Sequence, residues 1–480
     1  MRIRSTVLVL LLSTAAFGQT GHKIDIHIKG LKDTTLLLGY FLGDQTYVRD
    51  TAKVNSQGNL EFKGSKALPR GVYFLVAEKT PLFNFLISNH QHFSLDTDKE
   101  DYIKFMKVKG DEDNDLFFAN MRFNAEMHQL ADPYIKVIQD STLKEDQKTD
   151  ARKEFNKING KVMAYQDELI KTHPDYLTAK MLKLTREVTV PDPPKKADGS
   201  IDSSFQLRYY RKHYFDNFDL SDDALTKLPR PVYTEKLYDY LDKLFLQTPD
   251  SLMAAINELV TRVQKNPEAY KFLVWNCVYH YQRPTIMGLD EVYVRLVDKY
   301  FISGAMDFWA PPSIKQSLKD YADKLRMSLI GKTGANLTMQ DQTLQPRSLY
   351  DIKKKYTILY IFDPDCGHCR EETPKLVNFY EKDKAKFNIE VYAVSLDTSL
   401  QKMKNYMKEM KMTWITVNGP RSYVGPVSKH YYAETTPSLY VLDDKKKIIA
   451  KGIPAEQLEN FFGNYEKYLQ RKAAVKPKGT

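Results

Sequence analysis

The spacing of apolar residues changes twice along the chain of 480 residues, and this change restricts the fold more than any other feature of the sequence. In residues 19–108 apolar and polar residues alternate, which is typical of half-buried strands. In residues 109–330 apolar residues recur every three or four positions, which indicates amphipathic helices. Residues 331–472 alternate short apolar runs with helical patterns. We therefore predict a multidomain protein with an N-terminal all-β sandwich, a central all-α helical domain and a C-terminal α/β domain.

The N-terminal region contains several short strand patterns separated by turns. We expect an antiparallel sandwich, because short strands at this spacing commonly pair with their neighbours in sequence. The strand patterns lie at residues 24–28, 35–41, 47–54, 59–62, 71–77, 82–87 and 92–96. His90 and His92 are close in sequence but lack a nearby acidic or cysteine partner, so we assign them to a surface loop and not to a metal site.

The central region shows helix patterns at residues 235–245, 252–264 and 269–281. A loop that contains proline and glycine at 191–200 separates helices. A ligand groove is one use of the aromatic stretch 209–219, but we expect this stretch to pack in a core. Cys277 lies in an apolar helix pattern with no second cysteine nearby, which predicts a buried and unreactive thiol.

Residues 1–18 have the parts of a cleaved signal peptide. Two arginines precede an apolar run at residues 7–12, and Ala16 and Gly18 supply small residues at the −3 and −1 positions of a cleavage site. The run is too short to span a bilayer, and no later segment is apolar over a sufficient length. We therefore expect a periplasmic protein without an integral membrane segment, in a compartment that permits disulfides.

Charge and cysteine content exclude two further classes of protein. The formal net charge is +10, but basic residues are mixed with acidic ones and no arginine-rich arm or zinc-finger spacing is present. We therefore predict no nucleic-acid partner, and we interpret residues 473–480 as a short basic tail. The three cysteines are too few to build a disulfide framework.

The cysteine chemistry is concentrated in Cys366-Gly367-His368-Cys369, which follows the apolar run 356–362 and opens a helix pattern. The free N–H groups at a helix N-terminus favour a thiolate on Cys366. Two intervening residues let Cys369 close a disulfide with it, and a positive charge on His368 would lower the pKa of Cys366 further. This context predicts a redox pair.

Three other uses of such a cysteine pair fit less well. A structural zinc site needs four ligands, and the sequence has no second cysteine pair. Covalent haem attachment needs a histidine after the second cysteine, where Arg370 stands. A purely structural disulfide across so short a loop would constrain little chain. We therefore predict no metal, and no cofactor beyond a redox-active disulfide between Cys366 and Cys369.

Together with the cysteine pair, three further residues make residues 331–472 resemble a thioredoxin-fold domain, closest to the TlpA/ResA-like thiol–disulfide oxidoreductases of the bacterial envelope. Pro374 stands where the family has a proline that kinks the active-site helix, and Glu372 stands where the ResA-like branch has an active-site glutamate. Pro437 stands in a segment that resembles the cis-proline loop. The resemblance implies catalytic roles for Cys366, Cys369, His368 and Glu372, and substrate contacts by Gly367, Thr436 and Pro437. The regions before residue 331 resemble multidomain envelope proteins of Bacteroidetes.

Two residues depart from the thioredoxin pattern. Tyr360 occupies the position of the buried aspartate that accepts protons in thioredoxin, and the resemblance to the ResA branch lets Glu372 take that role. Asp365 replaces the tryptophan that usually precedes the pair, and its carboxylate would raise the pKa of Cys366 against the effect of His368. The redox potential and the direction of electron flow therefore stay open.

The expected activity is disulfide exchange with protein substrates, with a membrane electron-transfer protein as electron source if the protein is a reductase. An envelope binding or scaffold protein with an accessory redox domain is one alternative. A peroxiredoxin-like peroxidase is another, although Leu359 and Asp363 replace the proline and the threonine or serine that peroxide activation needs. No residue pattern fixes the substrate or the oligomeric state, for which a homodimer is one option.

Overall fold

The computed structural model describes residues 21–195 and 197–475, so the predicted signal peptide lies outside the described residues. The described chain divides into two compact units. The first unit consists of the residues up to Tyr240 together with Arg262–Ala269, and the second consists of Leu241–Thr261 together with the residues from Tyr270 onward. The helical region therefore contributes to both units. None of the helices in the described ranges has the length and apolar character needed to cross a membrane.

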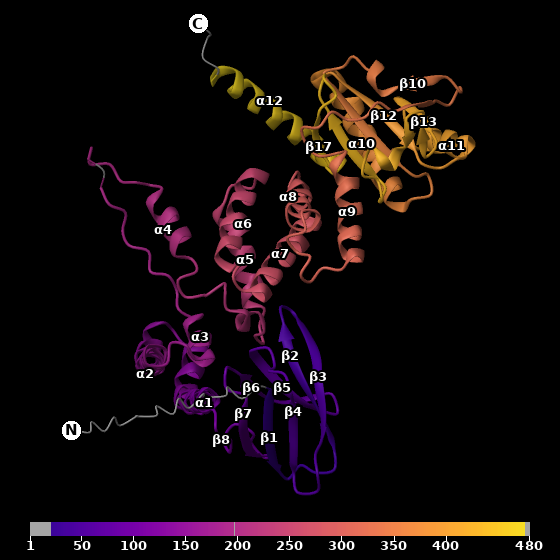
Figure 1. The fold of residues 1–480 in the computed structure, drawn as a ribbon. Coiled ribbons are helices and arrows are strands. Elements are labelled where there is room, and N and C mark those ends of the chain that lie inside the picture. Colours follow the sequence, from indigo (N-terminus) through magenta and orange to yellow (C-terminus); the bar gives the residue numbers. More distant parts are fainter. Residues whose placement is uncertain (1–20, 196, 476–480) are drawn as a thin grey trace, which may run out of the picture. The chain divides into compact units, whose positions relative to one another are not determined.

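The first unit begins with two four-stranded sheets that enclose one apolar core (Figure 1). One sheet has the strand order β4-β1-β7-β8 and the other β3-β2-β5-β6. The strands are β1 (His22–Lys29), β2 (Thr35–Leu42), β3 (Gln45–Lys53), β4 (Asn59–Gly64), β5 (Gly71–Ala77), β6 (Thr80–Ile87), β7 (His92–Asp98) and β8 (Lys107–Lys109). The core contains alternate residues of strands from both sheets, as a sandwich requires. The predicted sandwich is confirmed.

From the sequence patterns we expected a wholly antiparallel sandwich, but one pair of its strands is parallel. Strand β1 pairs with β4 in antiparallel register but with β7 in parallel register, with Ile24 opposite Phe93. Local alternation predicts that a segment is a strand, but it carries no information about the direction of a partner so distant in sequence. Of the two histidines, His90 lies in an exposed loop and His92 begins β7.

Helices follow the sandwich in the first unit. They are α1 (Glu112–Gln139), η1 (Asp146–Lys148), α2 (Thr149–Thr172), α3 (Leu177–Lys183), α4 (Phe205–His213), η2 (Asp223–Thr226) and α5 (Val232–Leu244), of which α5 extends into the second unit. Helix α1 begins before its first aromatic residues because the carboxylate of Asp111 accepts from the backbone N–H of Asp113. In the aromatic stretch 209–219, Tyr214, Phe215 and Phe218 are buried, whereas α4 itself has no buried residue.

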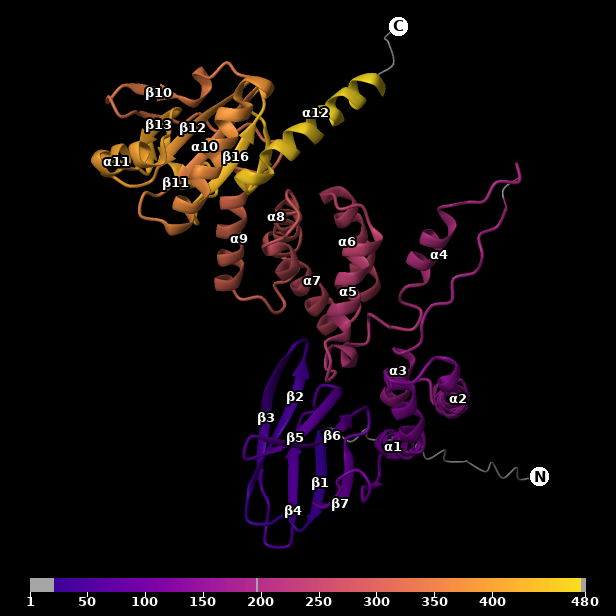
Figure 2. The ribbon, with the colours of Figure 1, turned by 180° about the vertical axis from the view of Figure 1, so that it is seen from behind.

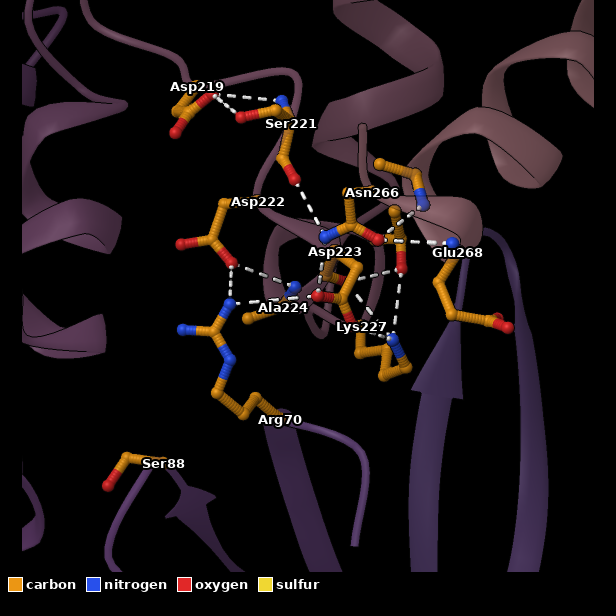
Figure 3. A network of polar contacts seen from close by, with 12 residues as sticks. Arg70, Ser88, Asp219, Ser221, Asp222, Asp223, Ala224, Lys227, Asn266 and Glu268 are labelled. Carbon is orange, nitrogen blue, oxygen red and sulfur yellow. Dashed lines mark hydrogen bonds and ion pairs between the residues drawn. The ribbon is translucent and has the colours of Figure 1, made fainter. Parts of the chain in front are cut away.

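A buried network of charges joins the sandwich to these helices (Figure 3). The carboxylate of Asp222 is 2.5 Å from the guanidinium of Arg70 and 2.6 Å from the amine of Lys180. It also caps η2 by accepting from the backbone N–H of Ala224 at 3.1 Å. Arg70 directly precedes β5, so one carboxylate fixes a strand, a helix and a turn.

Four further helical segments precede the C-terminal sheet. They are α6 (Pro249–Val263), α7 (Pro267–Gln282), α8 (Asp290–Leu296) with the π-helical turn η3 (Val297–Ile302), and α9 (Pro312–Arg326). Cys277 on α7 has no exposed surface, and burial raises the pKa of its thiol far above the ordinary value. The burial of Cys277 agrees with the prediction of a buried and unreactive thiol.

The C-terminal part of the second unit is built on a five-stranded sheet of order β13-β12-β11-β16-β17 (Figure 2). The sheet consists of β11 (Tyr356–Phe362), β12 (Ile389–Ser395), β13 (Ile415–Asn418), β16 (Ser438–Leu442) and β17 (Ile448–Lys451), and its helices are α10 (Gly367–Phe387), α11 (Leu400–Met410) and α12 (Leu458–Val475). Shorter elements complete it, namely β9 (Thr338–Gln340), β10 (Pro346–Ser348), η4 (Leu349–Asp351), β14 (Arg421–Ser422), β15 (Gly425–Pro426), η5 (Val427–Lys429) and η6 (Ala455–Gln457).

Every residue of the central strand β11 is buried. Ile358 and Tyr360 pack into the core that includes α10 and α12, whereas Leu359 and Ile361 pack into a second core on the opposite face. This double burial explains the continuous apolar run. The predicted C-terminal α/β domain is confirmed. Helix α12 continues to Val475, so the predicted basic tail starts within a helix.

Candidate active site

The two cysteines lie at the point where the chain leaves the central strand β11 and enters helix α10. Cys366 is the N-cap residue of α10, and its Sγ accepts from the backbone N–H of Cys369 at 3.4 Å. Cys366 is partly exposed, whereas Cys369 has no exposed surface. Both thiols are free in the structure. The strand-to-helix turn thus presents one sulfur to solvent and holds the second behind it.

The environment of Cys366 lowers the pKa of its thiol below the ordinary value. Partial burial acts in the opposite direction and is the largest single effect. It is outweighed by hydrogen bonds from the side chains of Thr436 and Cys369 and from the backbone N–H groups of Cys369 and His368. The side-chain hydrogen bonds lower the pKa most, and the free N–H groups at the helix N-terminus add to this effect.

The two sulfurs differ strongly in acidity. Burial raises the pKa of Cys369 to about 12, against a smaller lowering effect of a hydrogen bond from the backbone of Asp363. At neutral pH Cys369 is therefore a thiol, while Cys366 is the sulfur poised to ionise. This asymmetry assigns nucleophilic attack to Cys366.

His368 and Asp365, which flank Cys366, were expected to act on its pKa through their side-chain charges, and their contacts in the structure are different. His368 is exposed, and its contribution to the acidity of Cys366 comes from its backbone N–H. Asp365 does not act on Cys366 as an isolated charge, because its carboxylate is 2.6 Å from the amine of Lys402. The same amine is 3.1 Å from Asp397.

Three carboxylates near the pair, those of Asp363, Asp365 and Asp397, are close enough to share a metal ion. Their ligand atoms lie within 4.8 Å of one another, which makes them the one such group among the described residues. Lys402 already supplies a cation to two of the three. The arrangement is that of a surface ion-pair cluster.

The predicted cis-proline loop lies against the reactive sulfur. The peptide bond between Thr436 and Pro437 is cis. The thiol of Cys366 donates to the carbonyl oxygen of Thr436 at 3.2 Å. The loop is followed directly by β16, which pairs with the central strand β11. The sheet therefore brings together two segments that are 70 residues apart in sequence.

Glu372 and Pro374 both lie on helix α10 after the pair. One carboxylate oxygen of Glu372 accepts from the backbone N–H of Ala455, and the other is 3.3 Å from the amine of Lys375. Pro374 lies inside α10, which runs as one helix to Phe387. Gly367 is the first residue of that helix and is exposed.

A buried chain of hydroxyl groups lies in the same core as Cys369, and the sequence patterns did not indicate it as a unit. The hydroxyl of Thr373 is 2.8 Å from that of Tyr360 and 2.8 Å from that of Tyr406. Burial raises the pKa of Tyr406 to about 12 and that of Tyr360 further. Thr373 follows Cys369 by four residues, so helical spacing could have placed it on the same buried face.

The comparisons with known proteins concern mainly this C-terminal part. Tryparedoxin from Trypanosoma brucei brucei is 32% identical over 97 residues, which are 20% of this chain and 66% of that protein. The match thus spans just under two thirds of that protein's length.

Among solved structures, a domain of a possible thiol-disulfide isomerase from Cytophaga hutchinsonii is 40% identical. The match covers 30% of this chain and 97% of that chain, with a TM-score of 0.28. A thioredoxin-like protein from Bacteroides caccae is 17% identical, and that match covers 58% of this chain and 99% of that chain with a TM-score of 0.46.

Family models match three separate segments of the chain. Residues 22–117 and 180–324 each match a domain of unknown function (DUF4369 and DUF5106, respectively). Residues 354–448 match the family described as thioredoxin-like, and this segment contains the cysteine pair, the central strand and the cis-proline loop. Residues 354–448 therefore belong to the thioredoxin-like family, as the motif and the loop before β16 had indicated.

Proposed function

We propose that the protein is a periplasmic thiol–disulfide oxidoreductase that exchanges disulfides with protein substrates through Cys366 and Cys369. The observation that carries this proposal is the asymmetry of the pair. A partly exposed sulfur with a lowered pKa caps a helix beside the cis-proline loop, and a buried sulfur with a raised pKa lies one helical turn behind it. This is the division of labour that attack and resolution require.

In the first step the Cys366 thiolate attacks one sulfur of a substrate disulfide. A bond forms between Cys366 and that sulfur, the substrate S–S bond breaks, and the second substrate sulfur leaves as a thiolate. The backbone beside Pro437 pairs with the substrate in an extended conformation and aligns its disulfide with Cys366. Gly367 and Thr436 also contact the substrate in this proposal, as the resemblance implies.

In the second step Cys369 resolves the mixed disulfide. Because burial keeps Cys369 protonated, its proton must be removed first, and the leaving substrate thiolate is the base that accepts it. The Cys369 thiolate then attacks Cys366, and the first substrate sulfur leaves as a thiolate. The pair has lost two electrons and the substrate disulfide has gained them.

The resemblance assigns the proton of Cys369 to Glu372, which stands as an alternative to the substrate thiolate. Both oxygens of the Glu372 carboxylate already have partners, namely the Ala455 N–H and the Lys375 amine. A carboxylate has about four acceptor positions, so these two contacts leave Glu372 able to accept a proton.

The reaction runs in either direction, and the potential of the pair decides which direction prevails. A stabilised thiolate favours the reduced form and raises the reduction potential. In the reducing direction we propose a membrane electron-transfer protein as the electron source. A measured midpoint potential tests which direction prevails, since a 30 mV difference in potential corresponds to about 1.4 kcal/mol for a two-electron couple.

The decisive experiment is trapping of mixed disulfides with the Cys369→Ser variant of the full chain. Partners should be captured through Cys366 and released by dithiothreitol. Cys366→Ser is the matched control and should capture none, while Cys277→Ser should leave trapping by Cys369→Ser unaltered because Cys277 is buried. Full exchange activity in Cys366→Ala would overturn the mechanism. A Cys366 that resists alkylation near neutral pH would favour the scaffold alternative.

A further inference from the structure

A groove of about 460 Å³ lies beside the cis-proline loop, within the second unit. Thr435, Pro437 and Ser438 line one side of the groove. The other side is formed by the connection between α7 and α8, residues 282–288, which belongs to the helical region. We call this connection the groove loop. The redox domain alone therefore does not complete the surface around its own cis-proline loop.

The groove borders the loop that contacts the reactive sulfur. Thr435 and Pro437, which line the groove, flank Thr436, whose carbonyl oxygen accepts from the Cys366 thiol at 3.2 Å. A chain that pairs with the backbone at Pro437 while its own sulfur reacts with Cys366 must therefore extend into this groove.

The start of α8, directly after the groove loop, is anchored to the redox domain by buried polar contacts. The amine of Lys451 on β17 forms an ion pair with Asp290 at the start of α8, and it donates to the carbonyl oxygen of Ser328 at 2.9 Å. The hydroxyl of Ser328 also accepts from the backbone N–H of Tyr432 at 3.3 Å. Both charged side chains of the ion pair are at least 86% buried. These contacts hold the groove loop in place before a substrate arrives.

The chemistry of the groove loop suits a polypeptide. Ile286 and Met287 expose 44% and 43% of their surface, and paired exposed apolar side chains beside a reactive group mark an interaction surface. Methionine adapts to differently shaped partners. Arg283, also on the groove loop, is exposed and forms no ion pair with any residue in the described ranges.

We infer that the groove holds the polypeptide segment that flanks the reactive cysteine of a protein substrate, and that the groove loop selects among substrates. The segment contributes an apolar side chain against Ile286 and Met287 and an acidic side chain toward Arg283. This inference rests on the proposed disulfide exchange, but it adds a specificity determinant from outside the thioredoxin-like domain. It gives residues 282–288, which lie in the segment matching a domain of unknown function, a role in recognition.

The test compares turnover of a protein disulfide, insulin, with turnover of a small aromatic disulfide, dithiobis(nitrobenzoate), by the full chain. Ile286→Asp should lower the ratio of insulin turnover to small-disulfide turnover by about tenfold, because a charge opposes burial of the substrate's apolar side chain. Ile302→Asp is the matched control, since Ile302 is 46% exposed and does not line the groove. It should leave the ratio at the wild-type value.

A second variant tests the predicted charge preference. With peptides that carry a disulfide flanked by either glutamates or lysines, Arg283→Glu should reverse the preference from the acidic to the basic peptide. Unchanged ratios in both Ile286→Asp and Arg283→Glu would overturn the inference, as would equal losses with small and large disulfides. Neither result bears on the proposed function, which is tested separately by the activity of Cys366→Ala on both kinds of disulfide. Unaltered tryptophan-fluorescence unfolding verifies that each variant is folded.

Discussion

Two sulfurs separated by two residues experience opposite environments in this protein. Cys366 receives hydrogen bonds from the first turn of α10, whereas Cys369 is enclosed by the apolar core that β11 and α10 share. The difference in acidity arises from burial, from side-chain hydrogen bonds and from backbone N–H groups, more than from neighbouring charged side chains. The sequence predicted the acidity of Cys366 from its place at a helix start, whereas the contacts of His368 and Asp365 depend on the fold.

The first prediction concerns the alkylation of the reduced protein by iodoacetamide. Because the thiolate is the reactive form, labelling of Cys366 should follow its ionisation, with a midpoint below the ordinary thiol value of about 8.5. As pH falls through this midpoint the rate should decrease. Peptide mass mapping should find Cys369 and Cys277 unlabelled in the native protein up to pH 9, because burial keeps both protonated. Preferential labelling of Cys369 would contradict the assignment of the nucleophile.

The hydroxyl chain of Tyr360, Thr373 and Tyr406 shows where residue-level prediction from the sequence ends. Each residue belongs to a recognisable strand or helix pattern, but their contacts join a strand and two helices. A pattern along one element gives the face of a side chain, and contacts across elements need the packed structure.

At the scale of the elements, the sequence patterns predicted buried strands more accurately than strands at a sheet edge. The run at 356–362 was predicted with its observed bounds because both faces of β11 are covered, so that every residue is apolar or aromatic apart from Thr357. Strand β8, with three residues, lies at a sheet edge and carries too little alternation to be recognised. The cis-proline loop was predicted because its motif is local, whereas the parallel pairing of β1 with β7 was not.

The second prediction concerns Asp222, whose carboxylate contacts Arg70 and η2 (Figure 3) and also the amine of Lys180. The side chain of Asp222 is only 4% exposed, so Asp222→Ala leaves two cations without their shared partner and should destabilise the first unit by about 3 kcal/mol. Asp216→Ala is the control, since the Asp216 carboxylate is 58% exposed and, among the residues that the structure describes, pairs only with His213, so about 0.5 kcal/mol or less is expected.

The measurement for Asp222→Ala is urea unfolding followed by two signals. All three tryptophans, Trp275, Trp309 and Trp414, lie in the second unit, so their fluorescence reports that unit. Far-ultraviolet circular dichroism reports both units. Asp222→Ala should shift the circular dichroism transition while the fluorescence transition moves less. Equal shifts in both signals would show that the network does not act within the first unit alone.

At the scale of the whole molecule, the division into units differs from the order of the predicted regions. Three regions follow one another in sequence, and the structure confirms their fold classes. The predicted boundaries at 108 and 330 stay predictions. However, the helical region is divided between the units, because α8 and α9 pack against the redox domain through Asp290 and Tyr321. The periodicity of apolar residues indicates whether a segment is a helix or a strand, but it does not indicate which element a helix packs against.

The third prediction tests this division through the ion pair between Lys451 and Asp290. Lys451→Met leaves the buried Asp290 carboxylate without a cation and should destabilise the second unit by about 3 kcal/mol, measured from the tryptophan fluorescence transition in urea. The double variant Lys451→Met, Asp290→Leu should recover much of this loss, since an apolar pair avoids an uncompensated charge. Lys447→Met, at an exposed position near the same strand, is the control and should cost little. A single variant as stable as the wild type would contradict this account.

The contacts of Lys451 also bear on where the polypeptide can be cut for study in isolation. A recombinant fragment that begins at residue 331 would contain the complete redox pair but would lack both Asp290 and Ser328, the partners of a mostly buried amine. Its catalytic chemistry toward small disulfides could survive such a cut, while its recognition surface would be truncated. Kinetic constants obtained from that fragment would describe the reaction of the two cysteines. Only the longer polypeptide would reveal the preference of the protein among protein substrates.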